Sequence, residues 1–222
     1  MKKIMFNDKY GLTQAVLEGR KTQTRRIIKC PKEHKGEYVA GFHVRRNTAT
    51  GILADWPIMF DEEECDIDGA YIQPRYHRNE IVAVAQNYKD AGVRLIPTED
   101  DEFGCCAFSS DQSTGWYNKM FVAADLMPHQ IKITDVRVER LQDITEDDCL
   151  KEGIRKAIIG YYVDGLMVRD WKKESHRETE SGNIKLFPTP KLAYASLINK
   201  ICGNGTWERN PWVEAYTFTT ED

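Results

Sequence analysis

The sequence predicts an α+β fold with a small mixed sheet or barrel and elaborate insertions. Strand-like patterns are short and widely separated, helical patterns lie between and around them, and charged stretches with scattered Gly and Pro interrupt the series. The 222-residue chain is 41% hydrophobic and 30% charged, which is an ordinary composition for a globular protein with its own core. That length allows one large domain or two small ones.

The first predicted elements are one helix and two strands. Apolar residues recur at helical spacing over 10–18, and Gly19 is placed to end that helix. The apolar run 81–85 is typical of a buried strand. Residues 131–139 alternate apolar and polar side chains, and the alternation slips near Asp135, which predicts a β-bulge.

The remaining predicted elements are two helices and a closing strand. Thr145-Glu-Asp-Asp148 has the pattern of a capping box, which would begin a short helix through Glu152 that Gly153 ends. Residues 190–200 have helical periodicity, and apolar side chains from 213 to 218 indicate a strand after a proline. Together, these elements complete the α+β order.

The charge of the chain is unevenly distributed. The net charge of −4 excludes a uniformly basic protein that coats nucleic acid by bulk charge. The first 29 residues, however, hold eight Lys and Arg against two acidic residues, and four of the eight lie in Gly19-Arg-Lys-Thr-Gln-Thr-Arg-Arg26. Such a cluster just past a helix end suits phosphate or a nucleic-acid backbone. A solvated basic turn is the competing interpretation.

The rest of the sequence favours a cytoplasmic protein without a metal or cofactor. No apolar run approaches the length of a membrane span, and the basic start lacks the apolar core of a signal peptide. No CxxC pair, finger-type His spacing, Walker loop or serine-hydrolase motif occurs, and the five histidines are scattered. We expect reduced thiols at all six cysteines, which are Cys30, Cys65, Cys105, Cys106, Cys149 and Cys202.

The basic segment also carries a family resemblance. Leu17-Glu-Gly-Arg-Lys-Thr-Gln-Thr-Arg-Arg26 resembles the signature of the ASCH domain, a relative of the PUA RNA-binding fold, of the larger type found in phages, prophages and gut bacteria. About half of the chain shares the resemblance, over residues 1–29, 71–89, 119–154 and 191–220. It implies a PUA-like β-barrel with flanking helices, formed by residues 1–222 as a single domain with long inserted loops at about 30–70, 90–118 and 155–190.

The resemblance implies a binding module first. Such a module would recognise RNA or a modified nucleotide or nucleoside in a cleft lined by the basic segment, with Arg20, Thr22, Arg25 and Arg26 as the binding residues. A small nucleoside or a short single strand suits the acidic surroundings better than a long duplex. Aromatic side chains could stack on a base, although core packing is an alternative role for the candidates, which are Trp116, Tyr117, Trp207 and Trp212.

A second implied function is an amidohydrolase of N4-acetylcytidine-type nucleosides. One small ASCH branch carries out this reaction, and its functional residues fall on Lys21, Thr24 and Glu152 here. A lysine beside other cations can approach a neutral base and activate a threonine hydroxyl, and the glutamate would exchange a proton with the leaving amine. Structural roles for all three residues remain open, as does a third class, an accessory phage-derived protein with a protein partner. The sequence leaves the oligomeric state open.

Overall fold

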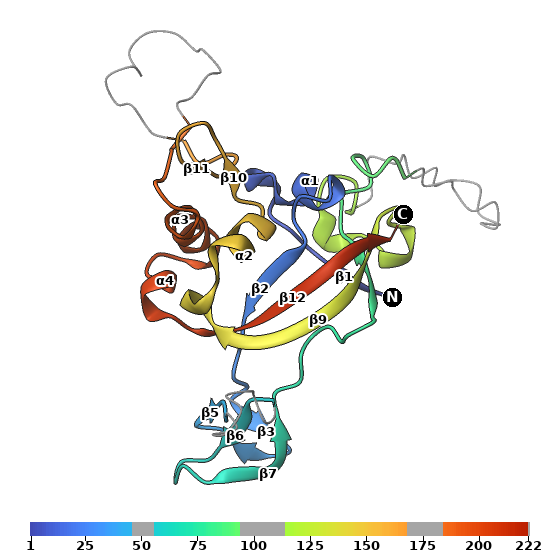
Figure 1. Cartoon of the computed structure of the whole chain (residues 1–222). Coiled ribbons are helices and arrows are strands. Elements are labelled where there is room, and N and C mark those ends of the chain that lie inside the picture. Colours follow the sequence, from blue (N-terminus) through green and yellow to red (C-terminus); the bar gives the residue numbers. More distant parts are fainter. Residues whose placement is uncertain (46–55, 94–113, 168–183, 222) are drawn as a thin grey trace, which may run out of the picture.

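The computed structural model describes residues 1–45, 56–93, 114–167 and 184–221 (Figure 1). Its centre is a five-stranded mixed sheet in the order β1-β8-β9-β12-β2. β1 runs parallel to β8, and every other neighbouring pair in this sheet is antiparallel. The strands are β1 (Lys2–Ile4), β2 (Gln23–Ile27), β8 (Ile81–Val84), β9 (Gln130–Arg140) and β12 (Trp212–Glu221). The predicted mixed α+β architecture is confirmed.

The two long strands, β9 and β12, form the backbone of this sheet. Thr217 lies opposite Asp135, whereas the next residue of β12, Phe218, lies opposite Ile133. β9 therefore holds one extra residue, Thr134, at this point, and the predicted bulge beside Asp135 is confirmed. The slip keeps Ile133 and Phe218 buried in the core despite the interrupted alternation.

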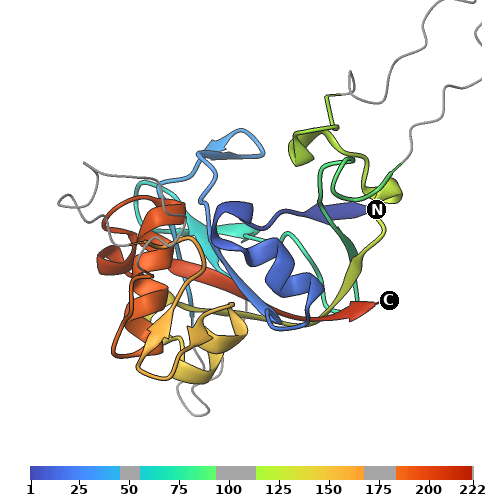
Figure 2. The same ribbon diagram turned by 90° about the horizontal axis from the view of Figure 1, so that it is seen from above.

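Short helices pack around the sheet. α1 (Leu12–Leu17) follows a 3₁₀ turn, η1 (Asp8–Tyr10), and its chain turns at Gly19 with a left-handed φ of 70°. α2 (Glu146–Lys151) begins where Thr145 Oγ1 accepts from the Asp148 amide at 3.1 Å, as predicted. α3 (Pro190–Cys202) and α4 (Thr206–Arg209) lie on the same side of the molecule as α2 (Figure 2).

The remaining short elements join these layers. The described 3₁₀ turns are η3 (Lys119–Phe121), η4 (Ala124–Leu126) and η5 (Leu141–Asp143), and a two-stranded ribbon consists of β10 (Arg155–Lys156) and β11 (Tyr161–Tyr162). The main hydrophobic core joins side chains of the sheet with side chains of the helical segments, and includes Val16, Ile144, Leu197 and Tyr216. A smaller cluster packs Tyr88, Val122 and Met127 beyond β8.

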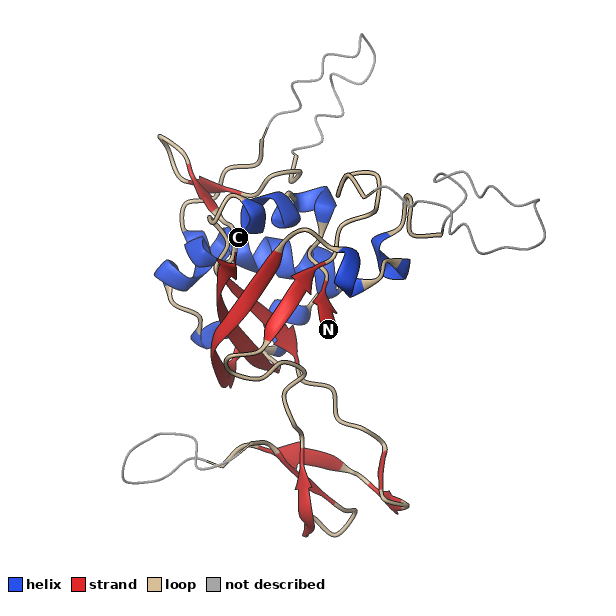
Figure 3. Ribbon diagram, turned by 90° about the vertical axis from the view of Figure 1, so that its right-hand side faces the viewer, coloured by secondary structure: helices blue, strands red, loops and turns tan. Residues whose placement is uncertain are grey.

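The stretch 30–70, which the sequence indicates as an insertion, contains strands of its own. β5 (Gly41–His43), β6 (Ile58–Phe60) and β7 (Asp66–Tyr71) form a three-stranded sheet, and β3 (Glu33–His34) pairs with β4 (Glu37–Tyr38). A separate apolar cluster, Val39, Met59, Ile67 and Ala70, holds this part together. It stands away from the central sheet and is joined to it by two segments of chain (Figure 3).

Several expectations differ from the structure or fall outside it. β1 and β2 were not predicted as strands, and they occupy opposite edges of an open sheet in the part of the chain that is described. Residues 94–113 and 168–183, within two of the predicted insertions, lie outside the described residues, as do Cys105 and Cys106. The other four cysteines are free thiols. None of the described helices is both long and apolar enough to cross a membrane.

Candidate functional site

The basic segment Gly19–Arg26 leads from the end of α1 into the edge strand β2. The backbone amide of Lys21 donates to the carbonyl of Ala15 at 2.8 Å, which ties the turn to α1. The next amide, of Thr22, donates to the carbonyl of Lys151 at 2.9 Å, at the end of α2. These two bonds place the segment against the residue that follows α2, Glu152.

Lys21 and Glu152 form a buried ion pair. Lys21 Nζ donates to Glu152 Oε2 at 2.5 Å and to the carbonyl of Glu152 at 2.8 Å. The side chains are 1% and 5% exposed, and Nζ also lies 5.8 Å from the centroid of the Phe6 ring. A buried ammonium with two hydrogen bonds and an aromatic face is well satisfied. The structure thus brings together two of the three candidate catalytic residues.

Arg25 extends this pair into a network. Its guanidinium contacts three carboxylates: Glu139 at 2.7 Å, and Asp148 and Glu152 at 3.1 Å each. Its NH1 group also donates to Gln23 Oε1 at 3.2 Å. The Arg25 side chain is fully buried. Carboxylates of the chain itself therefore neutralise this cation, which the sequence predicts as a binding residue for an anionic ligand.

The network shifts the pKa values of its members in opposite directions. Burial lowers the pKa of Lys21 by more than the Glu152 carboxylate raises it. Burial also disfavours the Arg25 cation, but Glu152 and Glu139 outweigh that effect and raise its pKa. For Asp148, burial raises the pKa, while the Arg25 guanidinium leads the interactions that hold it below its ordinary value. Of the two buried cations, Lys21 therefore gives up its proton more readily than Arg25.

Thr24 lies on the other face of β2. Side chains alternate along a strand, so Gln23 and Arg25 point toward α2 while Thr24 points away from it, beside Tyr216 of β12. Among the described contacts, no hydrogen bond joins Thr24 to Lys21 or to Glu152. The third candidate catalytic residue is buried and separate from the other two.

The remaining candidate binding residues are partly exposed. Arg20 Nε contacts Glu18 Oε2 at 2.6 Å, and Thr22 is half-buried. Arg26 donates to the carbonyl of Met5 at 2.6 Å and lies 5.9 Å from the Phe6 ring. Arg20, Thr22 and Arg26 thus form the accessible part of the basic segment.

The candidate stacking aromatics differ in exposure. Trp207 packs edge-on against Tyr194 in the core, and the Arg140 guanidinium lies 4.3 Å from the Trp212 ring. Trp116 packs on the cluster beyond β8, whereas Tyr117 is 67% exposed. Core packing therefore explains Trp207 and Trp116, and Tyr117 is the most accessible ring of the four.

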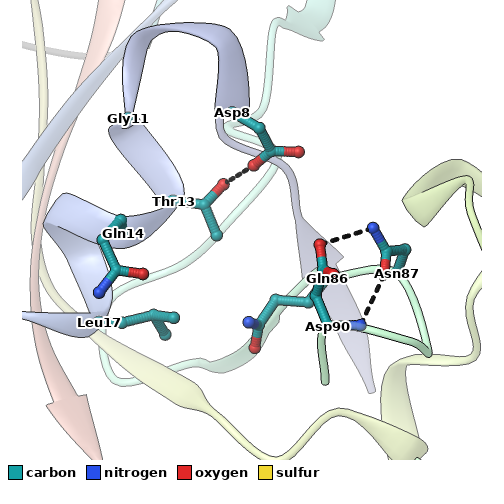
Figure 4. A pocket seen from close by; sticks show the side chains of 8 residues that line it. All are labelled: Asp8, Gly11, Thr13, Gln14, Leu17, Gln86, Asn87 and Asp90. Carbon is teal, nitrogen blue, oxygen red and sulfur yellow. Dashed lines mark hydrogen bonds between the residues drawn. The ribbon is translucent and has the colours of Figure 1, made fainter. Parts of the chain in front are cut away.

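Sequence analysis missed a hollow beside α1. It measures about 290 Å³ and is lined by η1, α1 and the segment that follows β8, with Gln86 in its wall (Figure 4). A glutamine after a strand carries no sequence signal for such a place, because α1 supplies the opposite wall. Within the described ranges, no group of three or more His, Cys, Asp or Glu side chains is placed to hold a metal ion.

Comparisons with protein-family models, with curated proteins and with solved structures each found no match to this chain. Its function must therefore be inferred from its own residues and their arrangement.

Proposed function

We propose that this chain is a PUA-like binding module of the ASCH type that recognises RNA or a modified nucleoside through its basic segment. The observation that carries the proposal is the division of that segment by exposure. Lys21 and Arg25 are buried and neutralised by carboxylates, whereas Arg20, Thr22 and Arg26 stay accessible beside them. The buried cations hold the segment in place, and the accessible side chains supply the hydrogen-bond donors that contact the ligand.

This arrangement favours a ligand of low charge over a long duplex. Only two cations of the segment, Arg20 and Arg26, are accessible, and each already has a partner in the chain. The electrostatic part of the affinity grows with the number of phosphates that the protein neutralises. Two arginines can neutralise only about two phosphates, so this contribution is small. Contacts with base edges or a ribose must supply the remaining affinity.

Fluorescence anisotropy with a short, labelled, single-stranded RNA tests this proposal. Arg20→Ala combined with Arg26→Ala should weaken RNA binding at least tenfold. The slope of log binding constant against log salt concentration should become shallower by about 0.7 for each phosphate that is no longer neutralised. Lys156→Ala combined with Lys200→Ala removes two exposed charges elsewhere and serves as the matched control. Equal losses in both double variants, or no binding of RNA or nucleosides by the unaltered chain, would overturn the proposal.

The Lys21–Glu152 contact favours amide hydrolysis as a second candidate function. A lysine with a lowered pKa, bonded to a glutamate from another element, is a proton-transfer pair. The Thr24 hydroxyl would attack the acetyl carbon of an N4-acetylated cytidine, and the C–N bond would break as the leaving amine takes up a proton. Water would then hydrolyse the acetyl ester, which releases acetate and restores the Thr24 hydroxyl. The substrate would have to reach a pair that is buried in this conformation.

Acetate release from N4-acetylcytidine tests the second function. Thr24→Val removes the candidate nucleophile while keeping its volume, and should abolish turnover. Thr219→Val, at an exposed position of β12, should retain it. The hydrolase assignment is wrong if the unaltered chain releases no acetate, or if Thr24→Val releases it at the same rate.

A further inference from the structure

The hairpin of β10 and β11 carries two isoleucines at its tip. The amide of Ala157 donates to the carbonyl of Gly160 at 2.9 Å, which closes the turn between the two strands. Ile158 and Ile159 occupy the two positions between them, where Ile158 is fully exposed and Ile159 is 78% exposed. The hairpin lies above α2 and α3, at the outer edge of the view in Figure 1. Two large apolar side chains therefore project from the molecule side by side in the sequence.

Neither the turn nor the core requires these isoleucines. The central positions of hairpin turns favour Gly, Asn and Asp, whereas β-branched residues favour strands. The left-handed conformation that this turn needs falls on Gly160, whose φ is 84°, and a Cβ there would lie 2.5 Å from the carbonyl oxygen of Phe187. Because Ile158 and Ile159 are exposed, they add nothing to the packing of the core. The pair points to a contact outside the chain.

Basic side chains stand behind the tip. Arg155 and Lys156 form β10, and Lys185 lies on the segment that pairs with β11, and all three are exposed. Within residues 155–167 and 184–187, the one carboxylate is Asp164, which contacts Arg155 at 3.3 Å. This part of the described chain thus carries an excess of positive charge, although the net charge of the whole chain is −4.

The side chains follow a fixed order from the tip inward. Lys156 lies opposite Tyr161, and one residue further back Arg155 lies opposite Tyr162, with its guanidinium 5.5 Å from that ring. Each step along a strand is about 3.3 Å, so the isoleucines reach further out than both rows. An anionic bilayer has the matching order, because its acyl chains lie beneath head groups where Lys, Arg and Tyr are favoured.

Other classes of partner match this order less well. Phosphates of an RNA would contact the cations but would leave the isoleucines in water. A protein partner would need a preformed pocket for a convex tip, whereas a bilayer accepts such a tip without one.

We propose that the β10–β11 hairpin attaches the protein reversibly to an anionic membrane surface. Ile158 and Ile159 enter the boundary between head groups and acyl chains, and Lys156 and Lys185 lie against the head groups. A small apolar anchor gives only marginal attachment by itself, and basic side chains beside it supply the second signal that is needed. The attachment does not depend on the function proposed above, because no residue of Gly19–Arg26 belongs to the hairpin.

Co-sedimentation of the full chain with lipid vesicles tests the apolar part of this contact. Vesicles of phosphatidylcholine mixed with phosphatidylserine should bind the unaltered chain. Ile158→Asn combined with Ile159→Asn suits the turn and keeps the charge, and should weaken binding about tenfold. Leu126→Asn combined with Leu192→Asn removes two exposed aliphatic side chains elsewhere, and should bind like the unaltered chain.

The same assay tests the part played by charge. Vesicles of phosphatidylcholine alone should bind the unaltered chain about tenfold more weakly than the anionic vesicles. Lys156→Gln combined with Lys185→Gln should weaken binding to the anionic vesicles to a similar extent. Lys29→Gln combined with Lys200→Gln, which removes two exposed charges outside the hairpin, should not.

Three results would overturn the attachment. The unaltered chain may fail to sediment with anionic vesicles, or the asparagine variant of the tip may sediment with them equally well. The third result is a loss of RNA binding in that variant without any vesicle binding, which would assign the tip to RNA recognition. Vesicle binding that depends on the tip, in a chain that binds no RNA, would confirm the attachment while the proposed function fails.

Discussion

Lys21 Nζ and Glu152 Oε2 meet at 2.5 Å although the two residues are 131 positions apart in the sequence. The bond joins the turn after α1 to the residue that ends α2, and Arg25 binds the second oxygen of the same carboxylate at 3.1 Å. One glutamate therefore fixes both buried cations of the basic segment. A lysine and a glutamate in contact could transfer a proton in catalysis, or could simply hold the two elements together. Variants of Lys21 and Glu152 distinguish these two roles.

Glu152→Gln should strongly destabilise the fold. The substitution keeps the size of the side chain but leaves Lys21 without a carboxylate and takes one of three from Arg25. Removing one partner of a buried ion pair typically costs about 3–5 kcal/mol in the free energy of unfolding. Urea denaturation followed by circular dichroism measures the loss.

The matched control for this change is Glu18→Gln. Glu18 pairs with Arg20 at the surface, where solvent screens the interaction, so the control should unfold almost like the original chain. Equal stability of Glu152→Gln and Glu18→Gln would contradict a structural role for the buried pair.

Lys21→Met and Glu152→Gln should show strong coupling in a double-mutant cycle. Each single change leaves an unpaired buried charge or acceptor, whereas the double variant removes the ion pair itself, and Arg25 keeps Glu139 and Asp148. We expect the double variant to be more stable than the sum of the two losses by about 1–3 kcal/mol. Strictly additive losses in the unfolding free energy would show that the two side chains do not interact in solution.

Local patterns in the sequence were enough to predict much of the fold. The Thr145 cap involves only residues that are close to it in the sequence. The bulge near Asp135 is visible as an interruption in the alternation of apolar and polar residues along one strand. The strand of the site was not predicted, because Gln23-Thr-Arg-Arg-Ile27 is mostly polar. It becomes a strand by pairing with β12, nearly two hundred residues later.

The candidate site was predictable only where a motif marked it. The resemblance pointed to Lys21 and Glu152, which do meet, and to Thr24, which alternation turns to the opposite face. The burial of Arg25 depends on carboxylates from β9 and α2, which no local pattern reveals. Gln86 is likewise placed by tertiary structure, through the parallel pairing of β1 with β8.

Glu214 should make stability fall as the pH rises above 4.5. The carboxyl is buried on β12, where it accepts from the Tyr216 hydroxyl, and burial raises its pKa above the ordinary 4.5. The folded state then binds a proton that the unfolded state has already lost, so the free energy of unfolding decreases as the pH rises through the raised pKa. Thermal melts between pH 4.5 and 7 measure this decrease.

Glu214→Gln should lose that pH dependence while retaining an acceptor for Tyr216. Glu221→Gln, at an exposed position of the same strand, should melt with the original pH profile. Asp148 and Glu80 act in the opposite sense, because interactions with cations and hydrogen-bond donors hold their pKa values below ordinary, and their contribution is lost as the pH falls below about 4. An unchanged profile above pH 4.5 in Glu214→Gln would refute the assignment.

Gly165→Ala should destabilise the fold more than Gly19→Ala, although both glycines have similar left-handed φ angles of 74° and 70°. A Cβ at Gly165 would lie 2.1 Å from the carbonyl oxygen of Lys9, whereas a Cβ at Gly19 would meet nothing within 4 Å. Both variants incur the left-handed strain of about 1–2 kcal/mol. Only Gly165→Ala adds a clash with backbone, typically about 1–3 kcal/mol more. Equal unfolding midpoints in urea would show that the turn after β11 does not pack against η1 in solution.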